Sequence, residues 1–187
     1  MPSIILWENI VSSVTDGPTL TAAARASCIP TPDRIIIPSK TFRVGSRIRF
    51  RMGGRISCVI TTPGTARLDI CMGAAGTTIV LDTLALGLNI VAKTTVPWYF
   101  DAELVCRAAG AGTVTTFFPQ AFFASEAVVG SGLPTVGGNG LLNVPVGTPA
   151  VGGGMDNTVA SILDVFFTQT VATGSFTVHN YSVDIAV

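Results

Sequence analysis

Charged side chains are scarce in this sequence. Asp, Glu, Lys and Arg make up 12% of the 187 residues, about half the share found in typical soluble domains. Eleven basic and eleven acidic residues cancel, which argues against a protein whose main partner is a polyanion such as nucleic acid. Hydrophobic residues make up 48%, and the mean hydropathy is +0.58. Such a chain either crosses a membrane or buries surface against copies of itself or partners.

Long uninterrupted hydrophobic runs are also missing. A membrane-spanning helix needs about 20 consecutive apolar residues, whereas Asp82 and Asn89 interrupt the most apolar stretch, residues 77–93. The first ten residues have no basic segment, and Glu8 lies inside their apolar run, so they do not resemble a secretory signal. We therefore expect no membrane segment, synthesis in a cytoplasm and association with other proteins.

Histidine and paired cysteines are too few for the common metal and nucleophilic centres. The only histidine, His179, lies in a strand-like segment without a nucleophile-elbow motif, and we expect an ordinary strand residue there. Cys28, Cys58, Cys71 and Cys106 show no C-x-x-C spacing. We interpret them as buried thiols of a reducing cytosol, with a Cys58–Cys71 disulfide as the alternative. No phosphate-loop motif occurs, so the sequence predicts no cofactor and no metal site.

One close pair of carboxylates is the only candidate for acid–base catalysis. Asp101 and Glu103 are two residues apart, which places their backbones ~6.6 Å apart on a strand, within the range of glycosidase pairs. Solvent-facing strands commonly carry such pairs, Arg107 is close in sequence, and no aromatic-rich cleft is evident. We therefore expect that the protein is not an enzyme.

Alternation of apolar and polar residues dominates the chain, and no segment has a helical period. Residues 96–107 are the clearest case, because Trp98 and Phe100 alternate with Tyr99 and Asp101. This pattern predicts a strand with Trp98 facing the core. Further strands are expected at 3–9, 34–37, 47–52, 66–72, 77–83, 113–125, 158–168 and 175–187.

Glycine and proline separate the predicted strands. Pro63-Gly64 suits a type II turn, so we expect residues 47–72 to form a long hairpin, with a bulge at Gly53-Gly54. Residues 130–156 are expected to form one long loop. The sequence thus predicts an all-β chain: an antiparallel, jelly-roll-like β-sandwich at residues 21–187, with an N-terminal arm at residues 1–20.

The most basic stretch of the chain, residues 47–57, contains what we call the arginine row: Arg47, Arg49 and Arg51. A solvated strand face, a patch that docks on an acidic protein, and a nucleic-acid surface are the three interpretations. Proteins that bind single strands expose aromatic rings among their basic residues. Here Phe50 alternates with the arginines and points to the opposite face. This favours the solvated face.

The succession of segments from residue 20 to 187 resembles a family of small structural proteins of tailed bacteriophages, the jelly-roll-like virion proteins that decorate or cement the capsid. The most specific parts are Pro38 and Gly45 before the first long strand, the "GRIS" element at 54–57 and the strand that begins at Trp98. The resemblance implies a homotrimer on the capsid exterior that bridges neighbouring capsomers of the major capsid protein lattice. It carries no catalytic residues to transfer.

The N-terminal segment offers an anchor for such a partner. Ile4, Ile5, Leu6 and Trp7 place four large apolar side chains where a domain normally keeps polar residues. We expect these residues, together with the arginine row, to dock on the partner. The alternative is a receptor- or glycan-binding module associated with a head or tail fibre. That function needs an exposed aromatic platform, which the inward-facing Trp98 does not supply.

Overall fold

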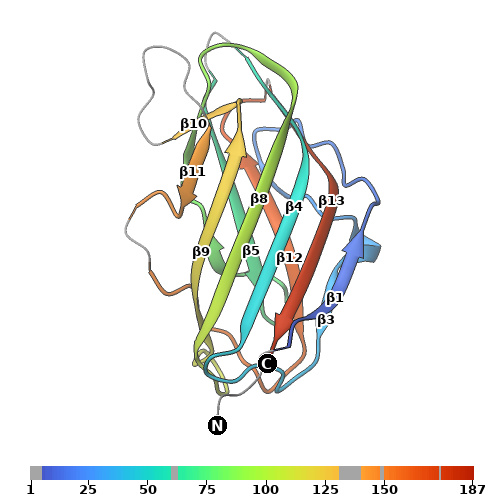
Figure 1. The fold of residues 1–187 in the computed structure, drawn as a ribbon, viewed down its shortest axis with the longest axis vertical. Coiled ribbons are helices and arrows are strands. Elements are labelled where there is room, and N and C mark those ends of the chain that lie inside the picture. The colour runs from blue at the N-terminus through green and yellow to red at the C-terminus, as the bar shows by residue number, and fades with distance from the viewer. Residues whose placement is uncertain (1–5, 60–62, 131–139, 148–149, 173) are drawn as a thin grey trace.

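The computed structural model describes residues 6–59, 63–130, 140–147, 150–172 and 174–187. Two antiparallel sheets pack face to face, which confirms the predicted antiparallel β-sandwich (Figure 1). The first sheet has the strand order β1 (Glu8–Ser13), β13 (Ser175–Ala186), β4 (Arg47–Cys58), β8 (Lys93–Ala108), β9 (Thr116–Ser125) and β11 (Leu141–Val144). We call it the six-stranded sheet.

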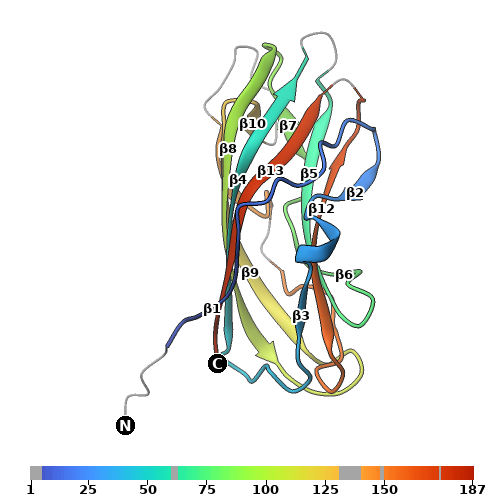
Figure 2. The ribbon, with the colours of Figure 1, turned by 90° about the vertical axis from the view of Figure 1, so that its right-hand side faces the viewer.

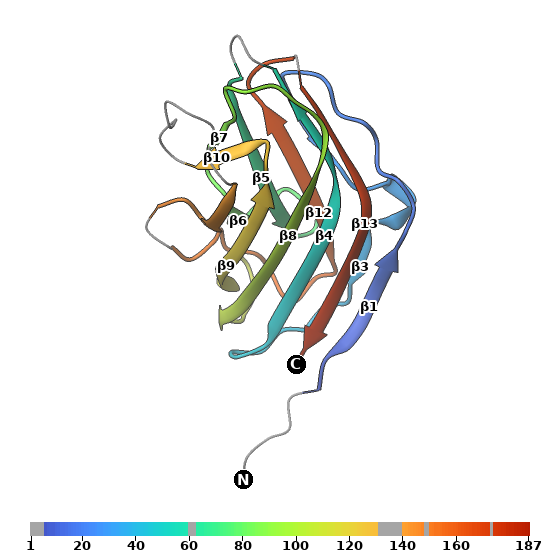
Figure 3. The same ribbon diagram turned by 45° about the horizontal axis from the view of Figure 1, so that its top comes forward.

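The second layer is the seven-stranded sheet. Its order is β10 (Val128–Gly130), β7 (Leu86–Leu88), β5 (Thr65–Met72), β12 (Ser161–Gln169) and β2 (Arg25–Ser27), while β3 (Ile35–Ile37) pairs with β12 and β6 (Thr78–Asp82) with β5. Figure 3 shows this layer behind the long strands of the first, and Figure 2 shows the two layers side by side. A single 3-10 turn, Thr31–Asp33, is the only helical element in the described ranges.

The core between the sheets follows the predicted alternation. Trp98 and Phe100 are buried, whereas Tyr99 is exposed. The Trp98 ring stacks on Phe176 of β13 at 4.5 Å between centroids, and Phe176 stacks on Phe167 of β12 at 4.0 Å. Since β12 belongs to the opposite layer, these stacked rings join the two sheets.

The predicted hairpin at residues 47–72 is wrong. β4 pairs with β8 and β13, whereas β5 pairs with β12, β6 and β7, so the chain changes sheets between β4 and β5. Two consecutive strands have the same alternating sequence pattern whether they pair in one sheet or face each other across a core. Cys58 and Cys71 therefore lie on strands of different sheets, and all four cysteines are free thiols.

Two other boundaries differ from expectation. The predicted loop at residues 130–156 contains β11, which pairs with β9 from Leu141↔Ala124 to Val144↔Ala121. The strand expected at 3–9 is found at Glu8–Ser13, where it pairs with the edge of β13. Residues 8–13, which the sequence assigned to the arm, thus form part of the six-stranded sheet. Residues 1–5 lie outside the described residues.

The predicted bulge occurs at the expected place but on the partner strand. Val178 pairs with Gly54 and Asn180 with Gly53, so His179 of β13 is the extra residue. A Cβ atom at Gly54 would lie 1.9 Å from the Thr177 carbonyl oxygen and 3.0 Å from Trp98 Nε1. The Trp98 indole N–H donates to that same carbonyl at 3.2 Å. Glycine at position 54 therefore lets the bulge and the indole approach the strand.

We expect Gly54→Ala to lower the free energy of unfolding by about 1–3 kcal/mol, because the added methyl group clashes with backbone that cannot move freely. Gly53→Ala is the matched control, since its added Cβ would meet nothing closer than the Asn180 side chain at 3.4 Å. Urea unfolding of both variants measures the difference. Equal losses in the two variants would contradict the close approach at Gly54.

Candidate functional site

The arginine row lies on the outer face of the six-stranded sheet. Ile48, Phe50 and Met52, which alternate with the row, are fully buried in the core. The guanidinium groups of Arg47, Arg49 and Arg51 remain partly exposed. The alternation across β4 is therefore as predicted, with Phe50 on the core side.

Each arginine of the row binds a carboxylate on a neighbouring strand. Arg47 Nη1 lies 2.6 Å from Glu103 Oε1 on β8, and Arg51 Nη2 lies 2.5 Å from Asp184 Oδ2 on β13. Arg49 donates through Nε and Nη2 to both oxygens of Asp101, at 3.0 Å and 2.5 Å. The positive charge of the row is therefore matched one for one by carboxylates.

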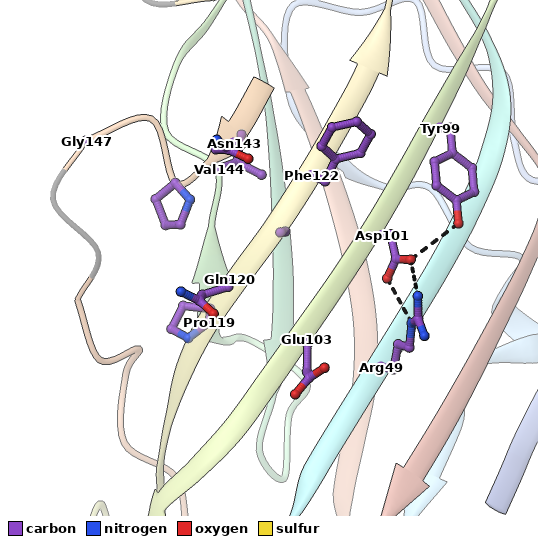
Figure 4. Close-up of a pocket in the computed structure, with 12 residues that line it drawn as sticks. Arg49, Tyr99, Asp101, Glu103, Pro119, Gln120, Phe122, Asn143, Val144 and Gly147 are labelled. Atoms are coloured by element: carbon purple, nitrogen blue, oxygen red, sulfur yellow. Dashed lines mark hydrogen bonds and ion pairs between the residues drawn. The ribbon is translucent and has the colours of Figure 1, made fainter. Parts of the chain in front are cut away.

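These ion pairs run diagonally across the sheet. Arg51 is directly opposite Asp101 in the β4–β8 register, and Arg49 is opposite Glu103. Arg47 and Arg49 nevertheless reach the β8 carboxylate two residues away from their direct partners. Arg51 reaches Asp184 of β13, two residues away from its direct partner on that strand, which is within range for a long side chain. Figure 4 shows the result around Asp101, whose carboxylate lies between Arg49 and the Tyr99 hydroxyl. The Asp101–Glu103 pair, considered above for catalysis, is thus held by two arginines.

Asp184 connects this face to the first strand of the chain. Asn9 of β1 donates from Nδ2 to Asp184 Oδ1 at 2.8 Å, while Arg51 occupies the other oxygen. Burial acts to raise the pKa of Asp184, but the hydrogen bonds from Asn9 and Arg51 outweigh it and hold the pKa below its usual value. Nothing in the local sequence singles out Asp184, because its partners Asn9 and Arg51 are far away along the chain.

A second feature is a group of exposed apolar side chains at the end of the sandwich where β1 begins and β13 ends (Figure 1, Figure 2). The register places Glu8 beside Ile185, and Arg47 beside both Ala186 and Val105. The start of β1, the start of β4 and the ends of β8 and β13 therefore meet there. We call the exposed apolar side chains of this region the apolar end: Leu6, Trp7, Val44, Val114, Val159 and Val187.

Leu6 and Trp7 are the only two residues of the predicted anchor that the structure places. Leu6 is 76% exposed and Trp7 is 44% exposed, directly before β1. Ile4 and Ile5 lie outside the described residues. The other members of the apolar end are three valines in separate loops and Val187, which follows β13, and sequence alone gave no sign that these segments lie at the same end.

Asn157 holds the loops of the apolar end together. Its side chain accepts from the Phe42 amide at 3.2 Å and donates to the Phe42 carbonyl at 2.8 Å. Its backbone amide donates to Gly110 at 3.0 Å, and its carbonyl accepts from Lys40 at 2.5 Å. A buried asparagine thus ties the β3–β4 and β8–β9 loops to the segment before β12, so the parts of the apolar end that carry Val44, Val114 and Val159 are held together.

Buried ion pairs on the outer face of the seven-stranded sheet have a structural role. Asp69 is bound by Arg25 at 3.0 Å and by Arg67 at 2.8 Å, and Asp164 is bound by Arg34 at 3.0 Å. Burial raises the pKa of both aspartates, and the arginines oppose that effect only in part. These pairs stabilise the junction of β2, β5 and β12.

Two of the buried thiols are held protonated, and the histidine contacts a carboxylate. Burial raises the pKa of Cys28, and it raises that of Cys71 to about 11, so both thiols stay protonated at neutral pH. His179 Nδ1 lies 2.7 Å from Asp16 Oδ1 at the surface bulge. His179 lies in strand β13, as expected, and is the bulged residue of that strand.

Within the part of the chain that the structure describes, no cluster of His, Cys, Asp and Glu side chains has the arrangement of a metal site. In the same residues, no helix is long and apolar enough to cross a membrane. No family model, no curated protein and no solved structure matches this chain.

We expect the protein to bind DNA weakly even at about 50 mM salt, because each arginine of the row already holds a carboxylate. The triple variant Asp101→Asn, Glu103→Gln, Asp184→Asn frees the row and should bind more tightly, with a log–log salt slope of about −2.7 for three phosphates. Fluorescence anisotropy with a DNA duplex measures both. Micromolar binding by the unmodified protein with a steep salt slope would contradict the neutralised face.

We expect the stabilising contribution of Asp184 to disappear in acid. Its folded pKa is lowered, so the contribution is complete above the unfolded value of about 3.9 and is lost as pH falls below it. Asp184→Asn should lower the free energy of unfolding by about 1 kcal/mol at neutral pH. Urea titrations from pH 7 downward should show the two proteins converging in acid. A difference that stays constant over this range would disprove the assignment.

Proposed function

We propose that this protein is a structural virion protein of a tailed phage, without enzymatic activity, that decorates the capsid exterior after synthesis in the host cytoplasm. It binds between capsomers of the major capsid protein lattice and stabilises their junctions. The observation that carries this proposal is the apolar end, where six exposed apolar side chains from five segments of the chain lie at one end of the sandwich.

The chemistry of the apolar end suits a permanent protein contact. Burial of a valine or leucine side chain contributes about 1.5–3 kcal/mol. Specific contacts between proteins bury about 800 Å² on each partner, and their centres are depleted in charge. The scarcity of charge in this chain suits a charge-depleted contact. The loops that Asn157 ties together also lose little entropy on binding, because they are preorganised.

The resemblance to capsid decoration proteins supports the same function, and it adds a homotrimeric state to the proposal. In a trimer, three apolar ends act on one lattice position. The second and third contacts then form at a high effective concentration, which strengthens attachment without any new kind of contact. The arginine row is a weaker candidate for docking, because its charges are already paired within the sheet.

We expect the double variant Leu6→Asp, Val44→Asp to lose attachment to capsids, because both side chains are exposed members of the apolar end. Co-sedimentation with capsid shells that lack the protein measures attachment. Val91→Asp is the matched control, since Val91 is an exposed valine near the opposite end of β8, two residues before Lys93. Unchanged circular dichroism in all variants excludes misfolding.

The outcomes separate two parts of the proposal. If the unmodified protein never sediments with the shells, capsid decoration is wrong. If the double variant binds as well as the Val91→Asp control, decoration stands but the apolar end is not the docking surface.

A further inference from the structure

A groove crosses the outer face of the six-stranded sheet and is not used by the proposed capsid contact. β8 and β9 form its floor, and β11 with the Pro145–Gly147 segment forms one wall (Figure 4). Its volume is about 780 Å³, within the range of small-ligand sites. The lining includes Tyr99, Asp101, Gln120, Phe122 and Asn143.

Two aromatic rings flank the polar centre of the groove. Tyr99 is 43% exposed, and Phe122 is partly exposed on the neighbouring strand. Tyr99 pairs with Ala124, and Asp101 pairs with Phe122, so the two rings are diagonal neighbours on the same face. Diagonal neighbours lie about 7–8 Å apart, which is within reach of aromatic side chains. A ligand in the groove therefore meets two apolar ring surfaces with hydrogen-bonding groups between them.

The side-chain amides of Gln120 and Asn143 can both donate and accept hydrogen bonds. Gln120 and Asn143 are exposed, and within the described ranges neither side-chain amide bonds to another protein group. Each amide offers two donor hydrogens and an acceptor oxygen. The Arg49–Asp101 pair adds donors and acceptors that it holds in fixed positions. Such a set matches hydroxyl groups, which both donate and accept.

The charges of the groove cancel. Arg49 is paired with Asp101, and Glu103 is paired with Arg47. An anionic or cationic ligand would have to compete with these internal pairs. A peptide that adds a strand is also excluded, because the groove lies on the face of paired strands, and such peptides bind at free edges.

From this combination of aromatic rings, free amides and balanced charge, we propose that the groove binds a neutral oligosaccharide. The sugar rings lie against Tyr99 and Phe122, and their hydroxyl groups bond to Gln120, Asn143 and the Arg49–Asp101 pair. This inference does not rest on capsid decoration, because the apolar end contributes no residue to the groove. It gives the protein a second surface for a chemically different partner.

The test uses the full chain and defined probes: hexasaccharides of glucose, galactose, mannose and N-acetylglucosamine, with a heparin hexasaccharide as the anionic probe. NMR titration with isotope-labelled protein should show shifts in β8, β9 and β11 with at least one neutral probe, with a Kd of about 1 mM or below. Tyr99→Ala and Phe122→Ala should each weaken that binding about tenfold.

Phe118→Ala is the matched control, because Phe118 lies on the same face of β9 but outside the groove, beneath Arg107. It should bind the neutral probe as the unmodified protein does. Three results would overturn the proposal: no shift with any neutral probe at about 10 mM, binding of the heparin probe alone, or equal binding by the groove variants and Phe118→Ala. Thermal unfolding of each variant verifies that it is folded.

Discussion

The stacked rings of Trp98, Phe176 and Phe167 are the contact on which the sandwich depends. Phe176 lies between the other two, and its contact with Phe167 crosses from one sheet to the other. Aromatic side chains bury the largest areas of any residue and prefer defined stacking geometries, so this contact fixes both the spacing and the register of the layers. A slip of one residue in β8 would turn Trp98 outward and place Tyr99 in the core.

The bulge at His179 lies close to the same contact, because the Trp98 indole bonds to Thr177, two residues before it. Phe176 and Val178 face the core before the bulge, and Tyr181 and Val183 face it afterwards. Val178 and Tyr181 are three residues apart, whereas core-facing residues of a regular strand are two apart. The extra residue therefore reverses the alternation of β13. The reversal places Asp184 toward the outer face, where it meets Arg51 and Asn9. The attachment of β1 by a side-chain hydrogen bond therefore depends on one inserted residue in another strand.

The sequence contained the long strands but not their partners. Alternation in residues 47–52 and 96–107 correctly assigned Phe50 and Trp98 to the core. Adjacency in sequence then suggested that residues 47–72 form a hairpin, because alternation describes the faces of a strand and carries no information about its neighbours. Strands β2, β7, β10 and β11 have three or four residues, too few for a periodic pattern to appear.

The candidate sites were harder to predict for a related reason. Leu6 and Trp7 are contiguous, so their apolar character was visible in sequence, whereas Val44, Val114 and Val159 lie at the same end only through strand pairing and loop contacts. The groove combines Tyr99 with Phe122 and Asn143, which belong to three different strands. The exposed aromatic ring is that of Tyr99, the outward-facing neighbour of the buried Trp98. The shift in β13 from apolar residues at 176 and 178 to apolar residues at 181 and 183 was, in contrast, a local signal of the bulge.

The scarcity of charge has a consequence for recognition. The arginine row is paired with carboxylates on the same face, and Arg25, Arg34 and Arg67 are paired on the other sheet. Paired surface charges contribute little attraction for a distant partner, because their fields cancel and salt screens the remainder. The proposed partners are therefore recognised at contact distance, through apolar surface or through neutral hydrogen-bonding groups. The apolar end offers the first kind of contact and the groove the second, and their separation on the molecule allows both to be occupied at once.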